Sequence, residues 1–138
     1  MRLLVGAAAV VTGVVIGAIV ISVAGGGNER PVAYRPLQAG PAELVIDQVE
    51  EDGPVFLRDP TGGDRSFFLD LEDGDIVALF FVPEGGSTEC PVDYDEQAER
   101  YEDCDGNPVR RDQLLRYPVT LQGTQDIVTV DLRRLVPK

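Results

Sequence analysis

Histidine is absent from this 138-residue sequence, methionine occurs once and cysteine occurs twice. Without histidine, the chain lacks the commonest general base and the commonest protein ligand for metal ions. A Ser-His-Asp triad is excluded, and so is a zinc site, because two cysteines alone do not complete one. We therefore expect no bound metal and no other cofactor.

Basic residues are also scarce: 24 acidic residues against 12 basic ones give a net charge of −12 at pH 7. Such a chain repels the phosphates of nucleic acids, which are not expected as partners. Basic protein surfaces or cations remain as partners. The length allows one small domain, which excludes a multidomain enzyme.

The longest apolar stretch runs from Leu3 to Val23 without a charged residue. As a helix rising about 1.5 Å per residue, it matches the roughly 30 Å hydrocarbon core of a bilayer. We predict a single-pass transmembrane anchor over residues 1–24, with the membrane as a partner. A cleaved signal peptide is the alternative, because Ser22 to Ala24 are small enough for a signal peptidase. The length of the stretch favours the anchor.

Small residues recur within this segment at Ala9, Gly13 and Gly17. Positions four apart share one face of a helix, and small residues there let another helix approach closely. The alternative is that glycine and alanine are simply common in membrane helices. The spacing predicts packing against other subunits of a membrane complex.

A stretch rich in glycine and proline over residues 25–41 predicts an extended linker, and residues 42–138 are expected to form one β domain. Short β patterns bounded by turn residues predict strands at 43–47, 54–57, 66–69, 75–82, 117–121 and 127–132. The last two flank a probable hairpin turn, and 59–63 is a second turn cluster. At most one helical turn is expected, at 95–101. The predicted fold class is all-β, a small sandwich or barrel.

The two cysteines, Cys90 and Cys104, are expected to form a disulfide, which requires an oxidising compartment. Closing this loop would stabilise the fold by about 3 kcal/mol in the chain-entropy description. The expected location is the cytoplasmic membrane, with the C-terminal domain extracytoplasmic. Two unpaired buried thiols are the alternative. No Cys-x-x-Cys motif is present, so thiol–disulfide catalysis is not expected.

The surroundings of these cysteines resemble the cluster-binding loops of a Rieske iron–sulfur domain. Rieske proteins hold a [2Fe–2S] cluster through two motifs, C-x-H-x-x-C and C-x-C-H-G. The first cysteine and the histidine of each motif are ligands, and the other two cysteines form a disulfide. Residues 85–90 and 102–106 occupy these two motifs, residues 76–79 resemble the strand before the first, and residues 115–119 and 127–131 suit the downstream pattern. The resemblance implies a Rieske-like fold.

All four ligand positions of the resemblance are changed. Gly85 and Glu102 stand in place of the ligand cysteines, and Ser87 and Asp105 stand in place of the histidines. The cluster needs thiolates on one iron and imidazoles on the other, so cluster-dependent electron transfer is not implied. An unrelated sandwich with one disulfide is the alternative.

Acidic residues gather around the two motifs and predict a docking surface for a basic partner such as a c-type cytochrome. The residues of this predicted surface are Glu84, Glu89, Asp93, Asp95, Glu96, Glu99 and Asp103. A solvated loop surface is one alternative. A calcium loop over 93–95 or 103–107 is another, although neither segment has EF-hand spacing.

Together these features predict a redox-inactive, Rieske-like accessory subunit of a respiratory or photosynthetic electron-transport complex. It would be anchored by one helix, and it would brace its neighbours or dock a basic cytochrome. The alternative is a free-standing extracytoplasmic binding module for a cation or a basic ligand. An enzyme that uses Glu102 and Asp105 as paired carboxylates is a third possibility, but the sequence reveals no nucleophile and no catalytic residue is assigned.

Overall fold

The computed structural model describes residues 35–138. The predicted anchor, its residues Ala9, Gly13 and Gly17, and most of the predicted linker lie outside the described residues. Within residues 35–138, no helix is long and apolar enough to cross a membrane.

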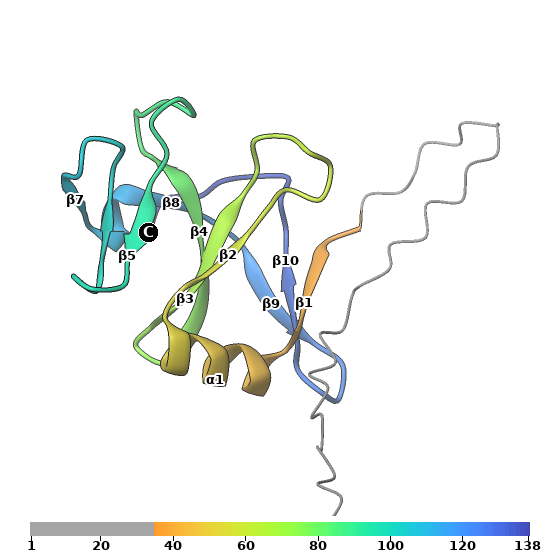
Figure 1. Cartoon of the computed structure of the whole chain (residues 1–138). Coiled ribbons are helices and arrows are strands. Elements are labelled where there is room, and N and C mark those ends of the chain that lie inside the picture. Colours follow the sequence, from red (N-terminus) through yellow and green to blue (C-terminus); the bar gives the residue numbers. More distant parts are fainter. Residues whose placement is uncertain (1–34) are drawn as a thin grey trace, which may run out of the picture. The chain divides into compact units, whose positions relative to one another are not determined.

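Ten strands, one α-helix and one 3₁₀ turn make up this part of the chain (Figure 1). Their bounds are β1 Leu37–Pro41, α1 Ala42–Asp52, β2 Val55–Leu57, β3 Phe67–Glu72, β4 Asp75–Pro83, β5 Asp93–Asp95, β6 Arg100–Glu102, β7 Pro108–Val109, η1 Arg111–Gln113, β8 Leu114–Tyr117, β9 Val119–Gln122 and β10 Ile127–Val130. The predicted all-β class is confirmed.

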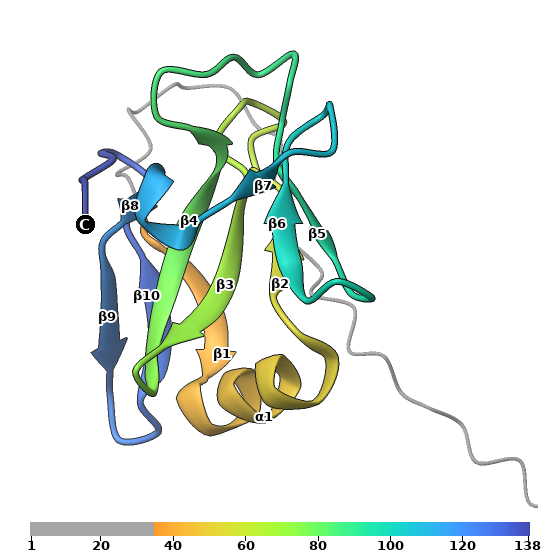
Figure 2. The ribbon, with the colours of Figure 1, turned by 90° about the vertical axis from the view of Figure 1, so that its left-hand side faces the viewer.

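The strands form three antiparallel sheets, with the orders β1-β10-β9, β2-β3-β4-β8 and β5-β6-β7. We call them the first, central and third sheets. Figure 2 shows α1 at one end of the domain and the loop between β4 and β5 at the opposite end. The predicted C-terminal hairpin is present as β9 and β10, with Val119 opposite Val130.

The central sheet is buried on both faces, as the nearly continuous apolar run at 75–82 predicts. Phe67 and Leu69 of β3, with Ala78 of β4, belong to the core shared with α1 and the first sheet. Phe68 and Leu79 belong to a second core, shared with the third sheet. Successive residues of a strand point to opposite faces, so β3 and β4 contribute to both cores.

The prediction of a strand at 43–47 is wrong, because these residues lie in α1. The apolar, partly β-branched run at 44–46 has a local preference for extended structure. In the helix, Ala42, Val45 and Val49 are buried at spacings of three and four residues. Packing of this face into the first core therefore outweighs the local preference. Gly53, at φ 84°, ends the helix and donates its N–H to the carbonyl oxygen of Val49.

Two other segments differ from the sequence-based prediction. Residues 37–41, placed in the linker, form β1 and pair with β10. The helical turn expected at 95–101 is instead the hairpin of β5 and β6. The Asp95 carboxylate accepts hydrogen bonds from the backbone N–H groups of Gln97 and Ala98, at 2.8 and 3.0 Å. Such side-chain bonds compete with helix formation and close a turn instead.

The turn cluster at 59–63 is organised by the buried carboxylate of Asp59. It accepts hydrogen bonds from the backbone and hydroxyl of Thr61, at 2.9 and 2.7 Å, and from Nε of Arg65 at 3.1 Å. Burial alone would raise the pKa of Asp59, but these bonds from Thr61 and Arg65 outweigh it and lower the pKa to about 2.

We predict that Asp59→Asn lowers the free energy of unfolding at pH 7 by about 1–3 kcal/mol, because the ionised carboxylate and its bonds are lost. The depressed pKa means that the stabilisation is complete above the ordinary pKa of 3.8 and disappears as the pH falls through about 2. Urea unfolding of wild type and variant between pH 6 and pH 2 should therefore show the difference shrinking below about pH 4.

Asp64→Asn in the same loop is the control, since Asp64 is exposed. It should shift stability by less than about 0.5 kcal/mol. A difference between Asp59→Asn and wild type that persists unchanged to pH 2 would contradict this assignment.

Candidate functional site

A disulfide joins Cys90 to Cys104, which confirms the predicted pairing. Cys90 lies in the loop between β4 and β5, residues 84–92, which we call the first loop. Cys104 lies in the loop between β6 and β7, residues 103–107, which we call the second loop. Cys104 is exposed, whereas Cys90 is half-buried. The β5–β6 pairing, with Asp93 opposite Glu102, already brings one end of each loop together, and the disulfide joins the loops beyond that pairing.

The second loop is also held by hydrogen bonds to Asp103. Its carboxylate accepts from the backbone N–H groups of Asp105 and Asn107, both at 2.9 Å, and from the side-chain amide of Asn107 at 3.1 Å. The bonds from Asn107 are the main reason that the pKa of Asp103 lies below its usual value. The second loop is thus fixed by its own residues.

The structure places the four residues at the Rieske ligand positions on or beside these loops. Gly85, at φ 77°, is the third residue of a turn in which the Gly86 N–H donates to the Pro83 carbonyl oxygen, and the hydroxyl of Ser87 accepts the backbone N–H of Glu89 at 3.2 Å. Glu102, in β6, pairs with Arg100 at 2.6 Å.

Asp105 lies beside the disulfide: its carboxylate and the two sulfurs lie within 4.8 Å of one another. Because the sulfurs are bonded to each other, they offer no thiolate to a metal. The oxygen that remains is a hard ligand, unsuited to an iron–sulfur cluster.

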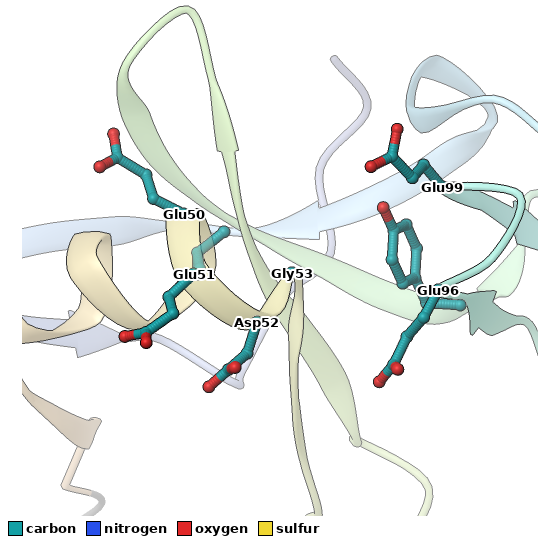
Figure 3. Close-up of a pocket in the computed structure, with 8 residues that line it drawn as sticks. Glu50, Glu51, Asp52, Gly53, Glu96 and Glu99 are labelled. Carbon is teal, nitrogen blue, oxygen red and sulfur yellow. The ribbon is translucent and has the colours of Figure 1, made fainter.

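Acidic side chains surround a groove between the C-terminal end of α1 and the turn that joins β5 to β6. Figure 3 shows the acids of α1 on one side of this groove and Glu96 and Glu99 on the other. We call it the helix groove. It has a volume of about 520 Å³ and is lined by Val49, Glu50, Glu51, Asp52, Gly53, Tyr94, Glu96 and Glu99. The last turn of α1 has no basic residue, so the negative end of the helix dipole adds to the field of the carboxylates.

A second acidic groove lies beside the disulfide, and we call it the disulfide groove. It has a volume of about 560 Å³ and is lined by Pro91, Asp93, Tyr94, Asp95, Glu102, Asp103, Cys104 and Gly106. Tyr94 lines both grooves. Neither set of lining residues includes a lysine or an arginine. We call the two grooves together the acidic face.

Part of the predicted docking surface lies on the acidic face. Glu96 and Glu99 line the helix groove, and Asp93, Asp95 and Asp103 line the disulfide groove. Glu84 and Glu89 are exposed on the first loop but line neither groove.

The acids of α1 and the tyrosine between the grooves are not among the residues predicted from the sequence. Glu50, Glu51 and Asp52 form an acidic run in the sequence. The sequence predicts a strand at 43–47, so it does not place this run at the end of a helix. In the structure, that end of α1 approaches the β5–β6 turn and brings the run into the helix groove. Tyr94 is flanked by Asp93 and Asp95 in the sequence. An aromatic residue between two acids is the sequence feature that could have indicated its place on the acidic face.

Arginines line a third groove, which shares Tyr94 and Glu99 with the helix groove, but each of these arginines is paired with a carboxylate of its own. Arg100 pairs with Glu102, and Arg110 pairs with Asp112 at 2.9 Å. The pairing with Arg100 weakens the field of Glu102, so the remaining acids of the disulfide groove carry more of its negative potential.

The third sheet is fastened to the central sheet through the buried carboxylate of Asp70. The hydroxyl of Tyr101 donates to its Oδ2 at 2.8 Å, and Nε of Arg111 donates to the same oxygen at 2.6 Å. Asp70 and Tyr101 are 2% and 3% exposed. Burial and the neighbouring Asp70 raise the pKa of Tyr101 above its usual value, so the phenol stays a donor.

Searches of protein-family models, of curated proteins and of solved structures find no match to this chain.

We predict that Tyr101→Phe lowers the free energy of unfolding by about 1–3 kcal/mol, because Asp70 then loses a donor in a buried place. Tyr94→Phe is the matched control. Within residues 35–138 the Tyr94 hydroxyl makes no hydrogen bond, so this variant should differ from wild type by less than about 0.5 kcal/mol. Urea unfolding monitored by circular dichroism measures both. Equal losses in the two variants would contradict a fastening role for the Asp70 network.

Proposed function

We propose that this protein is a redox-inactive, Rieske-like accessory subunit of a membrane electron-transport complex, and that its acidic face docks a basic protein such as a c-type cytochrome. One observation carries the docking part of this proposal. Two acidic grooves share Tyr94, and no basic residue lines either of them.

The electrostatics of this surface suit a transient partner. Five carboxylates line the helix groove and four line the disulfide groove. Complementary charge of this kind accelerates encounter and orients the partner, while adding less to the lifetime of the complex. An aromatic ring between the grooves offers a surface for a lysine or arginine side chain, whose cation is attracted to the ring face.

The Rieske-like part of the proposal is supported by the two loops. The disulfide ties the segments that carry or adjoin Gly85, Ser87, Glu102 and Asp105. These four residues supply neither thiolate nor imidazole, so the loops would retain a contact surface without the chemistry of a cluster. This part of the proposal is argued from the spacing of the two loops and from the disulfide that joins them.

The membrane part of the proposal depends on the apolar segment over residues 3–23, which lies outside the described residues. A disulfide between exposed or half-exposed cysteines is typical of proteins in oxidising compartments, which supports an extracytoplasmic domain. A membrane anchor would hold the acidic face close to proteins that diffuse along the same membrane surface.

Binding to a basic c-type cytochrome tests the docking proposal. The full chain in detergent micelles would be immobilised, and the dissociation constant measured by surface plasmon resonance at low and at physiological ionic strength. The triple variant Glu51→Gln, Glu96→Gln, Glu99→Gln should bind about tenfold more weakly at low salt, mainly through a slower association rate. The difference should narrow as salt increases.

The matched control removes the same number of charges elsewhere. Asp47, Asp64 and Asp73 are exposed and line neither groove. The triple variant that combines Asp47→Asn, Asp64→Asn and Asp73→Asn should therefore weaken binding of the cytochrome by less than about threefold, through the change in net charge alone. Equal losses of affinity in the two triple variants would contradict a specific docking face. They would show that only the net charge of the protein attracts the cytochrome.

The anchor segment distinguishes a subunit from a free-standing module. Gly13→Leu would place a bulky side chain on the face shared by Ala9, Gly13 and Gly17, while making the segment more apolar. We predict that the variant stays in the membrane fraction but separates from its partners in native electrophoresis after mild detergent extraction. Unchanged co-migration of a Gly13→Leu, Gly17→Leu variant would exclude this helix as an assembly surface. Migration of the wild-type chain alone would favour the free-standing binding module.

A further inference from the structure

The two loops joined by the disulfide are held in unequal ways. At its ends, the first loop is fixed by backbone bonds from Glu84 to the Gln113 carbonyl at 3.0 Å and from Val92 to the Phe81 carbonyl at 2.7 Å. Between these ends, residues 85–91 are exposed except for Cys90. Their hydrogen bonds within residues 35–138 reach only Pro83 or other residues of the same loop.

The second loop is held by hydrogen bonds of its own in addition to the disulfide. Asp103 accepts three hydrogen bonds from Asp105 and Asn107, and the backbone N–H of Asp103 donates to the Asn107 carbonyl at 2.9 Å. The disulfide is therefore the one bond, among the described residues, that ties the middle of the first loop to another segment. Breaking it would release one loop and leave the other in place.

The position of this bond relates it to the acidic face. Pro91, next to Cys90 in the first loop, and Cys104 in the second loop both line the disulfide groove. Pro91 is the one lining residue that the first loop contributes, so release of that loop would move one wall of the groove. Cys104 is the more exposed residue of the two cysteines, so its sulfur is the one that we expect a thiol in solution to attack.

We propose that the Cys90–Cys104 disulfide is a redox-controlled clasp of the acidic face, and that its reduction opens the disulfide groove and weakens docking of the basic partner. This inference rests on the proposed docking function.

The reductant is a dithiol, and the exchange balances as follows. One thiolate of the dithiol attacks Sγ of Cys104, the bond between the protein sulfurs breaks, and Cys90 leaves as a thiolate that takes up a proton. The second thiol of the dithiol then attacks the mixed disulfide and releases Cys104. Two electrons and two protons reach the protein, and the dithiol becomes a cyclic disulfide.

The conformational part of the proposal is tested on the full chain in detergent micelles, with dithiothreitol as the dithiol. Reduction should proceed at neutral pH without denaturant and make both cysteines reactive toward maleimide. Hydrogen exchange read by mass spectrometry should become about tenfold faster at the hydrogen-bonded amides of residues 86–90, while residues 103–107 and strands β3 and β4 keep their rates. Unchanged exchange at these amides, or faster exchange throughout residues 35–138, would overturn the clasp. Faster exchange throughout the domain would show that the disulfide stabilises the whole fold and not the first loop in particular.

The docking part is tested with the basic c-type cytochrome as the probe. The reduced protein should bind about threefold to tenfold more weakly than the oxidised protein at low salt. The variant Cys90→Ser, Cys104→Ser should bind like the reduced protein and should not respond to dithiothreitol, which controls for effects of the reagent. Equal affinity before and after reduction would overturn the clasp, whereas failure of the oxidised protein to bind at all would overturn the docking function itself.

Discussion

The buried carboxylate of Asp70 is the contact on which the placement of the acidic face depends. It lies on the face of β3 opposite Phe67 and Leu69, and it accepts from Tyr101 of the third sheet and from Arg111 beyond β7. A buried charge is stable only when donors surround it, so the central strand can carry Asp70 only if the third sheet supplies them. The same hydrogen bonds fix the position and orientation of the third sheet, which has only short strands. Tyr94, opposite Tyr101 in the β5–β6 pairing, is fixed with it.

The acidic face follows from that placement. Once the β5–β6 hairpin is fixed, its turn lies across a groove from the C-terminal end of α1, and carboxylates from two distant parts of the chain converge. Like charges at such distances repel each other, and in a chain with a net charge of −12 this repulsion opposes compaction. The Asp70 network and the disulfide hold the hairpin against that repulsion. A basic partner would reduce the repulsion between these carboxylates. The negative charge that opposes folding of the acidic face is therefore the same charge that would attract the proposed partner.

The parts of the fold that the sequence reveals are those encoded by local patterns. The alternation at 127–132 and the apolar run at 75–82 predict β10 and β4, and a pair of cysteines in a chain without histidine predicts the disulfide. The helix α1 is missed because Leu44, Val45 and Ile46 have a local preference for strands, and only burial of Val45 and Val49 against the sheets decides otherwise. The Asp70 network joins residues 31 and 41 positions apart, and no local pattern encodes contacts of that separation. The acidic surface predicted from the sequence therefore contains acids of the β5–β6 hairpin but lacks those at the C-terminal end of α1.

The central claim is that the acidic face around Tyr94 is the surface at which a basic protein binds. Hydrogen exchange of the full chain in detergent micelles, with and without a basic c-type cytochrome at low ionic strength, tests it most directly, because the readout locates the contact. The account predicts slower exchange confined to peptides that cover residues 49–53 and 93–104, which include most of the residues that line the two grooves. Protection at the β9–β10 hairpin or along β2, with residues 93–104 unchanged, would contradict it.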